Sequence, residues 1–275
     1  MTKVDFNSKL SWIDDAIELG TSLTKSWFRG QSQTYGQLTP SAFRDDYREF
    51  WMGGSNEASF TEHFKRQAPA YSDYTPENLD YLEWLFLMQH HGTPTRLLDW
   101  TENVLVALYF VVRDHQDKDG ELWCLFPDEL NNKSIDSFGI SLTNSKYVKY
   151  LASEPFHNNP DQLKKELNIT KNITGPIALF PPMRFKRMIN QQSVFTIHPD
   201  PNDSATIPDL LKEEKHLVRY LIPKGRKLEL LRDLNSLGIR ENTLFPDLDS
   251  LSVSIKHELK TVAYSPPKPP KFHDL

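Results

Sequence analysis

The sequence predicts an α+β fold in which helices flank a mixed central sheet. Short aromatic or β-branched runs bounded by glycine or polar residues indicate strands, and other stretches repeat apolar residues at helical spacing. The 275 residues include 6 Trp, 10 Tyr and 16 Phe, which is enough ring surface for a sizeable core. No internal repeat or linker divides the chain. We therefore expect one domain over residues 1–263, with a variable insertion at about residues 131–172 and a Pro-rich tail at 264–275.

The first elements expected along the chain are helices around one strand. Apolar residues at helical spacing favour a helix at residues 9–19, which Gly20 would end. The aromatic, glycine-bounded run at residues 26–31 favours a strand. Further helices are expected at residues 41–50, 57–67 and 77–91, with Gly92 in the place of a C-terminal cap.

The middle of the chain predicts a strongly apolar helix at residues 102–113, with Thr101 as its cap. The preceding residues, 93–100, are too broken by proline for a helix start and too short for a long strand. Residues 131–172 are polar with one short helical pattern at 146–152, which indicates an insertion that varies freely in such a fold. The other expected elements are strands at residues 121–126, 177–180, 193–198 and 216–222, and helices at 226–237 and 247–259.

Composition excludes several classes of protein. No apolar run approaches the roughly 20 residues of a membrane-spanning helix, so we expect no membrane association. The single cysteine, Cys124, excludes an intramolecular disulfide and a cysteine-based zinc site. The start of the chain lacks the apolar core of a secretory signal, so a cytoplasmic location is expected. A net charge of −5 argues against nucleic-acid binding by bulk charge and leaves a local basic site open.

Motifs of several common enzyme classes are absent from the sequence. It has no nucleotide P-loop, no dinucleotide glycine fingerprint, no His-Glu-x-x-His and no Gly-x-Ser-x-Gly. These absences exclude kinases, Rossmann oxidoreductases, zinc proteases and common esterases. The candidate chemistry therefore lies in three polar clusters.

The first cluster centres on Arg29, at the end of an expected strand and followed by Gly30. A guanidinium presented there into a cleft could clamp a phosphate through two hydrogen bonds. Gly30 would let a ligand approach the backbone closely. The alternative is an arginine that only pairs with a carboxylate, and the cluster taken alone favours that alternative.

The second cluster, residues 89–100, crowds two His, an Arg, an Asp, two Thr and a Gln around a Gly-Pro turn. Loops so rich in polar groups beside apolar helices are typical of functional sites. His90 and His91 point about 100° apart on a helix, so we expect no shared metal ion. One histidine is expected to face a cleft and the other to hold backbone. Arg96 and Asp99 are close enough in sequence for a structural ion pair.

The third cluster is residues 184–192, which hold three cations and no acid. It favours either a solvated helix face or the rim of an anion-binding site. In the second case Gln191 or Gln192 would turn into the site.

These pieces together resemble the FRG-domain family, bacterial and phage proteins named after a Phe-Arg-Gly motif. The matching segments run in family order at residues 27–31, 38–44, 89–101, 107–110, 191–197 and 244–248. The family's usual Gly between Gln192 and Val194 is Ser193 here.

The family layout is similar to that of ADP-ribosyltransferases, and the resemblance implies a fold and a ligand. Under it, Arg29 with Gly30 and Gln31 would bind the pyrophosphate of NAD as substrate. The loop at residues 95–99 would lie beside the nicotinamide ribose, with Thr95 and Arg96 among the residues that bind NAD. No metal is implied.

The same resemblance implies catalytic positions. Gln192 would occupy the place where many such transferases keep a glutamate. Breaking the nicotinamide–ribose bond passes through an oxocarbenium-like state, and a glutamine orients groups without carrying charge. His90, His91 or Asp99 would therefore supply any base. We expect Arg29, the loop at 90–99 and Gln192 to meet at one cleft.

The implied activity is an ADP-ribosyltransferase that modifies a nucleic acid, a nucleotide or a protein, with the first two preferred. The family context implies phage defence or a toxin. The alternative is a non-enzymatic module that binds a nucleotide, a nucleic acid or a phage component. Arg29, Arg96 and Arg187 would then be anion contacts.

Overall fold

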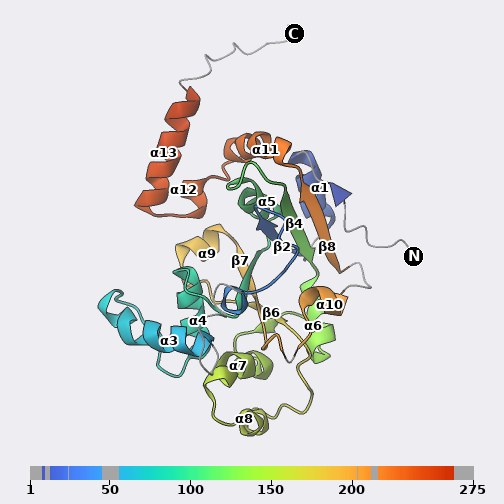
Figure 1. The fold of residues 1–275 in the computed structure, drawn as a ribbon, viewed down its shortest axis with the longest axis vertical. Helices are drawn as coiled ribbons and strands as arrows, with labels where there is room; N and C mark the ends of the chain where they lie inside the picture. Colours follow the sequence, from blue (N-terminus) through green and yellow to red (C-terminus); the bar gives the residue numbers. More distant parts are fainter. Residues whose placement is uncertain are drawn as a thin grey trace, which may run out of the picture.

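The computed structural model describes residues 8–9, 13–23, 25–44, 56–202, 204–211 and 216–262. These residues form one eight-stranded mixed sheet flanked by helices, which confirms the predicted fold class (Figure 1). The strand order is β1-β8-β4-β2-β3-β7-β6-β5. The expected tail at 264–275 lies outside the described residues.

The sheet consists of two half-sheets that meet at a narrow joint. Its strands are β1 (Ser8–Lys9), β2 (Trp27–Gln31), β3 (Leu97–Thr101), β4 (Gly120–Leu125), β5 (Ser141–Leu142), β6 (Ile177–Phe180), β7 (Ser193–Ile197) and β8 (Leu217–Ile222). The edge pairs β1–β8 and β5–β6 are parallel, and the other neighbours are antiparallel. β2 pairs with β3 at Phe28 and Thr101, whereas it pairs with β4 along its whole length. We call this contact the β2–β3 joint.

The helices cover both faces of the sheet. They are α1 (Ile13–Ser22), α3 (Asn56–Gln67), α4 (Tyr81–His90), α5 (Val104–Val112), α6 (Pro127–Ile135), α7 (Lys146–Ser153), α8 (Pro160–Glu166), α9 (Lys186–Asn190), α10 (Ile207–Leu211), α11 (Lys224–Ser236), α12 (Glu241–Leu244) and α13 (Leu248–Val262). Short 3₁₀ turns are η1 (Ser41–Phe43), η2 (Ala68–Ala70) and η3 (Glu154–Phe156). No helix of the described ranges is both long and apolar enough to cross a bilayer.

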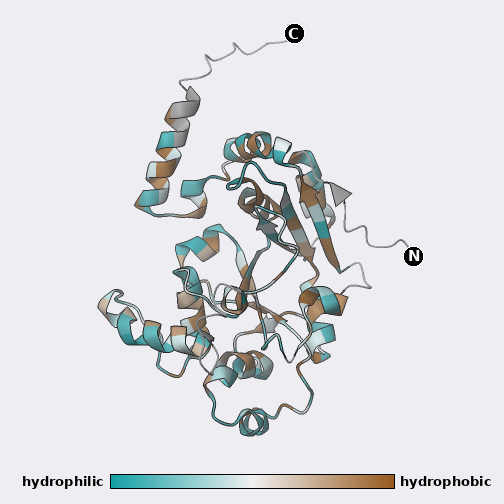
Figure 2. Ribbon diagram, viewed as in Figure 1, coloured by the Kyte–Doolittle hydropathy of each residue, from teal (hydrophilic) through white to brown (hydrophobic). Residues whose placement is uncertain are grey.

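Buried apolar side chains gather in three main cores. The first lies between α1, α5 and α11 and the half-sheet β8-β4-β2. The second lies between α4 and α7 and the half-sheet β3-β7-β6. The third packs on the opposite face under α6 and α10 and reaches both half-sheets, since Trp27 and Leu98 belong to it. Apolar residues accordingly concentrate on the strands and on α5 (Figure 2). The first two cores are separate, so different helices pack on this face of the sheet on the two sides of the β2–β3 joint.

Helix boundaries follow their capping groups. α4 begins at Tyr81, later than the predicted residue 77, because Asp80 caps it and accepts from Glu83 N at 3.3 Å. Gly92 has φ +78°, as expected for a C-terminal cap. The prediction that Thr101 caps the next helix is wrong. Asn103 is the cap, accepting from Leu105 N at 2.9 Å, and Thr101 is the last residue of β3.

Two further predicted elements differ from the structure. α1 continues through Gly20, which lies where a Cβ would be 2.7 Å from a Val104 methyl, so Gly20 allows α1 to approach α5. The helix expected at 41–50 is only the turn η1. Arg44 is extended, with φ −80° and ψ 153°, and residues 45–50 lie outside the described ranges.

The segment 131–172 contains more structure than the one predicted helix. It holds the end of α6, the edge strand β5, α7, η3 and α8. Asn131 is buried, and its side-chain amide bonds the backbone N and O of Ala178 at 2.7 and 3.0 Å. Val148 and Leu151 join the second core. This segment is therefore tied to the sheet by both polar and apolar contacts.

Candidate functional site

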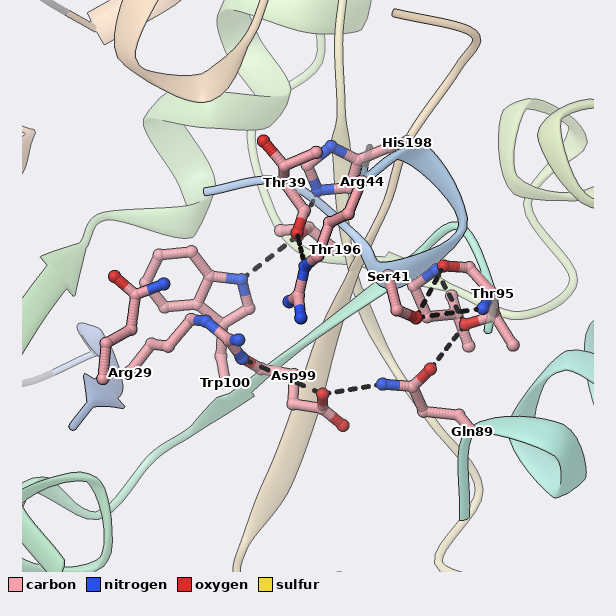
Figure 3. A network of polar contacts seen from close by, with 12 residues as sticks. Arg29, Thr39, Ser41, Arg44, Gln89, Thr95, Asp99, Trp100, Thr196 and His198 are labelled. Carbon is pink, nitrogen blue, oxygen red and sulfur yellow. Dashed lines mark hydrogen bonds and ion pairs between the residues drawn. The ribbon is translucent and has the colours of Figure 1, made fainter. Parts of the chain in front are cut away.

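A cavity of about 370 Å³ lies beside the β2–β3 joint, and we call it the joint cavity. β2, β3 and α5 form most of its wall. Polar or charged side chains that line it are Arg29, Ser41, Arg44, Gln89, Thr93, Asp99, Thr101, Arg187, Gln191 and Ser193. Figure 3 shows how several of them converge from separate elements. Of the expected meeting of Arg29, the loop at 90–99 and Gln192, the structure brings Arg29 and Asp99 into one cavity, and Gln192 does not line it.

Arg29 is a mostly buried cation at the centre of this wall. Its side chain is 16% exposed, and Nη1 donates to the backbone O of Asp99 at 2.7 Å. The Asp99 carboxylate lies farther away, at 3.8 Å from Nη1. Arg29 Nε is buried without a hydrogen-bond partner among the described residues. Burial lowers the pKa of Arg29, and Asp99 only partly offsets this.

Asp99 is held by a chain of side-chain hydrogen bonds (Figure 3). Gln89 at the end of α4 donates from Nε2 to Asp99 Oδ2 at 2.6 Å. Thr95 Oγ1 donates to Gln89 Oε1 at 2.5 Å, and Ser41 Oγ accepts from Thr95 N at 3.2 Å. Thr95 is fully buried and does not line the joint cavity, so the structure places it behind Gln89.

Two further arginines line the joint cavity. Arg44 is exposed, and its Nε donates to Thr39 O at 3.1 Å. Arg187, from α9, donates to His90 O at 3.4 Å and lies over the Phe245 ring at 4.5 Å. Burial lowers the pKa of Arg187. Within the described ranges, three arginines thus face a cavity whose one lining carboxylate is Asp99.

Arg96 does not pair with Asp99, and that expectation is wrong. Residues an odd number of positions apart along extended backbone point to opposite faces. Arg96 is 2% exposed and pairs through Nε with the Glu57 carboxylate. Its Nη1 donates to Leu151 O at 3.0 Å, and Glu154 lies at 3.5 Å. Arg96 therefore joins β3 to α3 and α7 and stays outside the joint cavity.

The two histidines also lie outside the joint cavity. The His90 ring stacks on Phe185 at 4.2 Å, and burial lowers its pKa to about 4, with His91 and Arg187 adding to the effect. His91 is exposed and meets His90 edge-on at 4.9 Å. Neither histidine faces the joint cavity, although His91 lines a second pocket beside α3. The described part of the chain gathers no three His, Cys, Asp or Glu side chains able to hold a metal ion.

Gly30 and Gln31 serve packing more than the cavity. A Cβ on Gly30 would lie 1.9 Å from the carbonyl O of Ala107, so the close neighbour is the α5 backbone. Gly30 does line the joint cavity, but Gln31 does not. Gln31 is buried, accepting from Trp123 Nε1 at 3.0 Å and donating to Gln37 O at 3.1 Å.

Gln192 is exposed and does not line the joint cavity, although its neighbours Gln191 and Ser193 do. It adopts φ +46°, and its backbone O accepts from Glu102 N at 3.1 Å. Gln191 is the inward residue, and its Nε2 donates to Leu244 O at 3.2 Å. Ser193 begins β7 in extended conformation.

A chain of hydrogen-bonding side chains that the sequence did not predict lies behind the cavity wall (Figure 3). Trp100 Nε1 donates to Thr196 Oγ1 at 3.1 Å, and Thr196 Oγ1 lies 2.9 Å from His198 Nε2. His198 is buried, and desolvation lowers its pKa to about 3, with Arg96 and Arg29 adding to the effect. The signal was available, because Thr196 and His198 are polar at a two-residue spacing along a strand.

Comparison with known proteins identifies part of the chain. The family model of the FRG domain matches residues 24–120. No curated protein and no solved structure matches the chain. The matched residues supply β2, α4, β3 and α5, and with them Arg29, Gln89 and Asp99. Arg187 and Gln191 lie beyond the match. The chain therefore carries an FRG domain over residues 24–120.

Proposed function

We propose that the joint cavity binds the diphosphate of NAD and that the protein transfers ADP-ribose from it to an acceptor. One observation carries the proposal: Arg29 is mostly buried, its Nε has no partner among the described residues, and two more arginines line the same cavity. Buried guanidinium groups bind phosphate through paired, charge-assisted hydrogen bonds. Arg44 and Arg187 would offset the second negative charge.

The cavity volume supports partial enclosure of such a substrate. About 370 Å³ lies near the lower end of the roughly 300–1,000 Å³ of small-molecule sites. The joint cavity is therefore sized for one nucleotide unit of a dinucleotide. The other unit would lie beyond its rim.

Asp99 is the residue that we assign to the chemistry. NAD supplies ADP-ribose when its nicotinamide–ribose bond breaks through an oxocarbenium-like state. A carboxylate beside that ribose stabilises developing positive charge and can take the proton that the attacking acceptor loses. Gln89 holds the Asp99 carboxylate in place at 2.6 Å. His90, His91 and Gln192 do not line the joint cavity, which favours Asp99 among the expected candidates.

The acceptor and the biological role rest on the resemblance to the FRG-domain family and to the layout of ADP-ribosyltransferases. A nucleic acid or nucleotide is the preferred acceptor, and a protein is the other. Phage defence or toxicity is the proposed context.

The test incubates the full chain with NAD and measures released nicotinamide, with DNA, RNA and lysate proteins as acceptors. Arg29→Lys keeps the charge and loses the planar fork, so NAD should bind about tenfold to hundredfold more weakly. Asp99→Asn should lower nicotinamide release at saturating NAD. Arg184→Lys, outside the cavity, is the matched control and should change neither quantity. If Arg29→Lys unfolds the protein while its folded fraction binds NAD normally, Arg29 is not a ligand.

A non-enzymatic binding module is the second candidate. The exposed position of Gln192 favours it, because the cavity then lacks the residue expected to replace a catalytic glutamate. A binder would hold NAD or another nucleotide without consuming it. Binding that Arg29→Lys weakens, with no nicotinamide release under any acceptor, would establish this alternative.

A further inference from the structure

A second pocket, of about 400 Å³, opens between α3, η2 and α4. We call it the aromatic pocket because rings dominate its wall. It is lined by Phe60, His63, Phe64, Gln67, Ala68, Tyr71, Ser72, Leu87, His91 and Thr93. We propose that the aromatic pocket binds a purine base. This site goes beyond the joint cavity and shares none of the arginines that line it.

Three aromatic rings, those of Phe60, Phe64 and Tyr71, line this pocket. Tyr71 is 86% exposed although its backbone N is fixed by Ala68 O at 2.9 Å, so its ring contributes little to any core. Phe64 is held from behind by Trp84, edge-on at 6.4 Å. Nucleobases stack on aromatic side chains of this kind, because every base has an apolar face.

Polar groups at the rim fit the edge of a base. His91 and Thr93 lie on one side of the pocket, after the end of α4. His63 and Gln67 lie on the other side, on α3, and Gln67 Nε2 donates to His63 O at 3.3 Å. Imidazole, hydroxyl and amide groups can both donate to and accept from ring nitrogens and exocyclic groups.

An adjoining groove favours a nucleotide over an aromatic side chain of a protein. The groove shares His63 with the aromatic pocket and is also lined by Glu62, Lys65, Arg66 and Asn78. Lys65 lies 3.5 Å from Glu62, and Arg66 is exposed. Because Lys65 is already paired with Glu62, Arg66 is the cation beside the aromatic pocket that would complement a base carrying a phosphate.

The aromatic pocket and the joint cavity are neighbours, because Thr93 lines both and Gly92 lines the cavity. A purine base could therefore come from two sources. It could be the adenine of the NAD that the joint cavity holds, or the base of a separate acceptor nucleotide. Either source of the base would make the same contacts with the rings. The binding of a purine does not depend on the proposed function, whereas the assignment of that purine to NAD does.

The experiment measures binding of adenosine to the full chain, because adenosine has the base without a phosphate to engage the arginines. Tyr71→Ala should weaken adenosine binding about tenfold or more, since it removes one stacking surface. Tyr71→Phe should retain it. Phe138→Ala, 73% exposed and distant in sequence from the pocket, is the control and should bind as the wild type does. Absence of adenosine binding, equal binding by the Tyr71→Ala and wild-type proteins, or a preference for p-cresol over adenosine would overturn the proposal.

A second arm adds NAD and identifies the source of the base. If the adenine of NAD occupies the pocket, adenosine should compete with NAD, and Tyr71→Ala should weaken both. If a separate nucleotide binds there, the two should bind together, and Tyr71→Ala should leave NAD affinity unchanged. Arg29→Lys should not alter adenosine binding in either case. Failure of NAD binding therefore leaves the aromatic pocket testable on its own.

Discussion

The ion pair of Arg96 and Glu57 shows how strongly one buried residue can bind separate parts of the chain. Both side chains are at most 2% exposed, and Glu57 also accepts from the backbone N of Arg96 at 2.6 Å. Removing one partner of such a pair leaves an uncompensated charge in a dry environment. Arg96 therefore stabilises the fold, whereas Arg29 presents its guanidinium to a cavity.

Glu57→Gln should lower the free energy of unfolding by about 3–5 kcal/mol, because Arg96 would stay charged and buried. Urea denaturation measures this directly. Arg184→Gln breaks the half-exposed pair with Glu83 and should cost less than about 1 kcal/mol. Equal losses in the two variants would show that the burial of Arg96 does not determine its contribution.

The His198 ring should make stability depend on pH. Trp100 Nε1 can only donate, so Thr196 Oγ1 accepts from it, and the same oxygen lies 2.9 Å from Nε2 of the buried His198 ring. Burial and the nearby arginines lower the pKa to about 3, from 6.5 in the unfolded chain. Between these values the unfolded state binds a proton that the folded state does not.

The contribution of His198 to the free energy of unfolding therefore has its full value above about pH 6.5. It falls as the pH drops toward 3, by up to roughly 1.4 kcal/mol per pH unit. Urea titrations at pH 7 and pH 4.5 should show a smaller loss for His198→Gln than for the wild type. His90, whose pKa is lowered to about 4, adds a similar loss in both proteins. Equal losses of unfolding free energy in the wild type and the variant would show that groups other than His198 cause the pH dependence.

Among the elements, the contact of β2 with α5 depends on one missing side chain. Gly30 lets the strand reach the α5 backbone, and a Cβ there would lie 1.9 Å from Ala107 O. The neighbours of α5 in the first core come from β2, β4, α1 and α11. Any displacement of α5 would therefore disturb that core and the wall of the joint cavity together.

Gly30→Ala should destabilise the fold strongly, because backbone on both sides must move to admit the methyl group. Gly225→Ala in α11 is the matched control, since a Cβ there meets nothing within 4 Å. That variant should be neutral or stabilise by up to about 1 kcal/mol. Comparable thermal midpoints for the two variants would contradict the importance of the β2–α5 contact.

Leu108 is fully buried in α5, and its loss should leave a cavity in the first core. Leu108→Ala should cost about 2–5 kcal/mol. Leu105→Ala removes the same atoms from a half-buried position and should cost less. The thermal midpoints of the two variants test this order.

At the scale of the whole molecule, the elements with strong periodicity could be predicted from sequence, and those whose form depends on distant partners could not. α5 and α11 were expected close to their observed ends because their apolar residues repeat regularly. The sequence does not predict β3 as a strand, because Pro94 and Asp99 interrupt a short apolar run. Its extended conformation depends on pairing with β7, which lies far away in the sequence. η1 replaced an expected helix, where Ala42 N bonds Thr95 O at 3.1 Å.

The site was predictable in part for the same reason. Arg29 and Asp99 were expected together because each belongs to a polar cluster that interrupts apolar elements, and Arg29 Nη1 indeed donates to the backbone O of Asp99. The expected place of Arg29 at a strand end is wrong, since Arg29 and Asp99 each lie in the middle of a five-residue strand. The partner of Arg96 is Glu57, which lies 39 positions earlier and carries no local signal. Arg44 was not singled out as a cavity residue, because only the extended backbone after η1 directs it there.

The β2–β3 joint has a consequence for how the protein opens under native conditions. Each half-sheet has its own helical cover on the cavity face, while one residue pair connects β2 to β3. Units that share so few backbone hydrogen bonds exchange their amides as separate cooperative blocks. Amides of β2 and β3 beside the joint should therefore exchange faster than those of the β4–β8 ladder, which pairs over six residues. A ligand that spans the joint would slow that exchange on both strands at once, so a deuterium pattern could report an occupant before its chemistry is known.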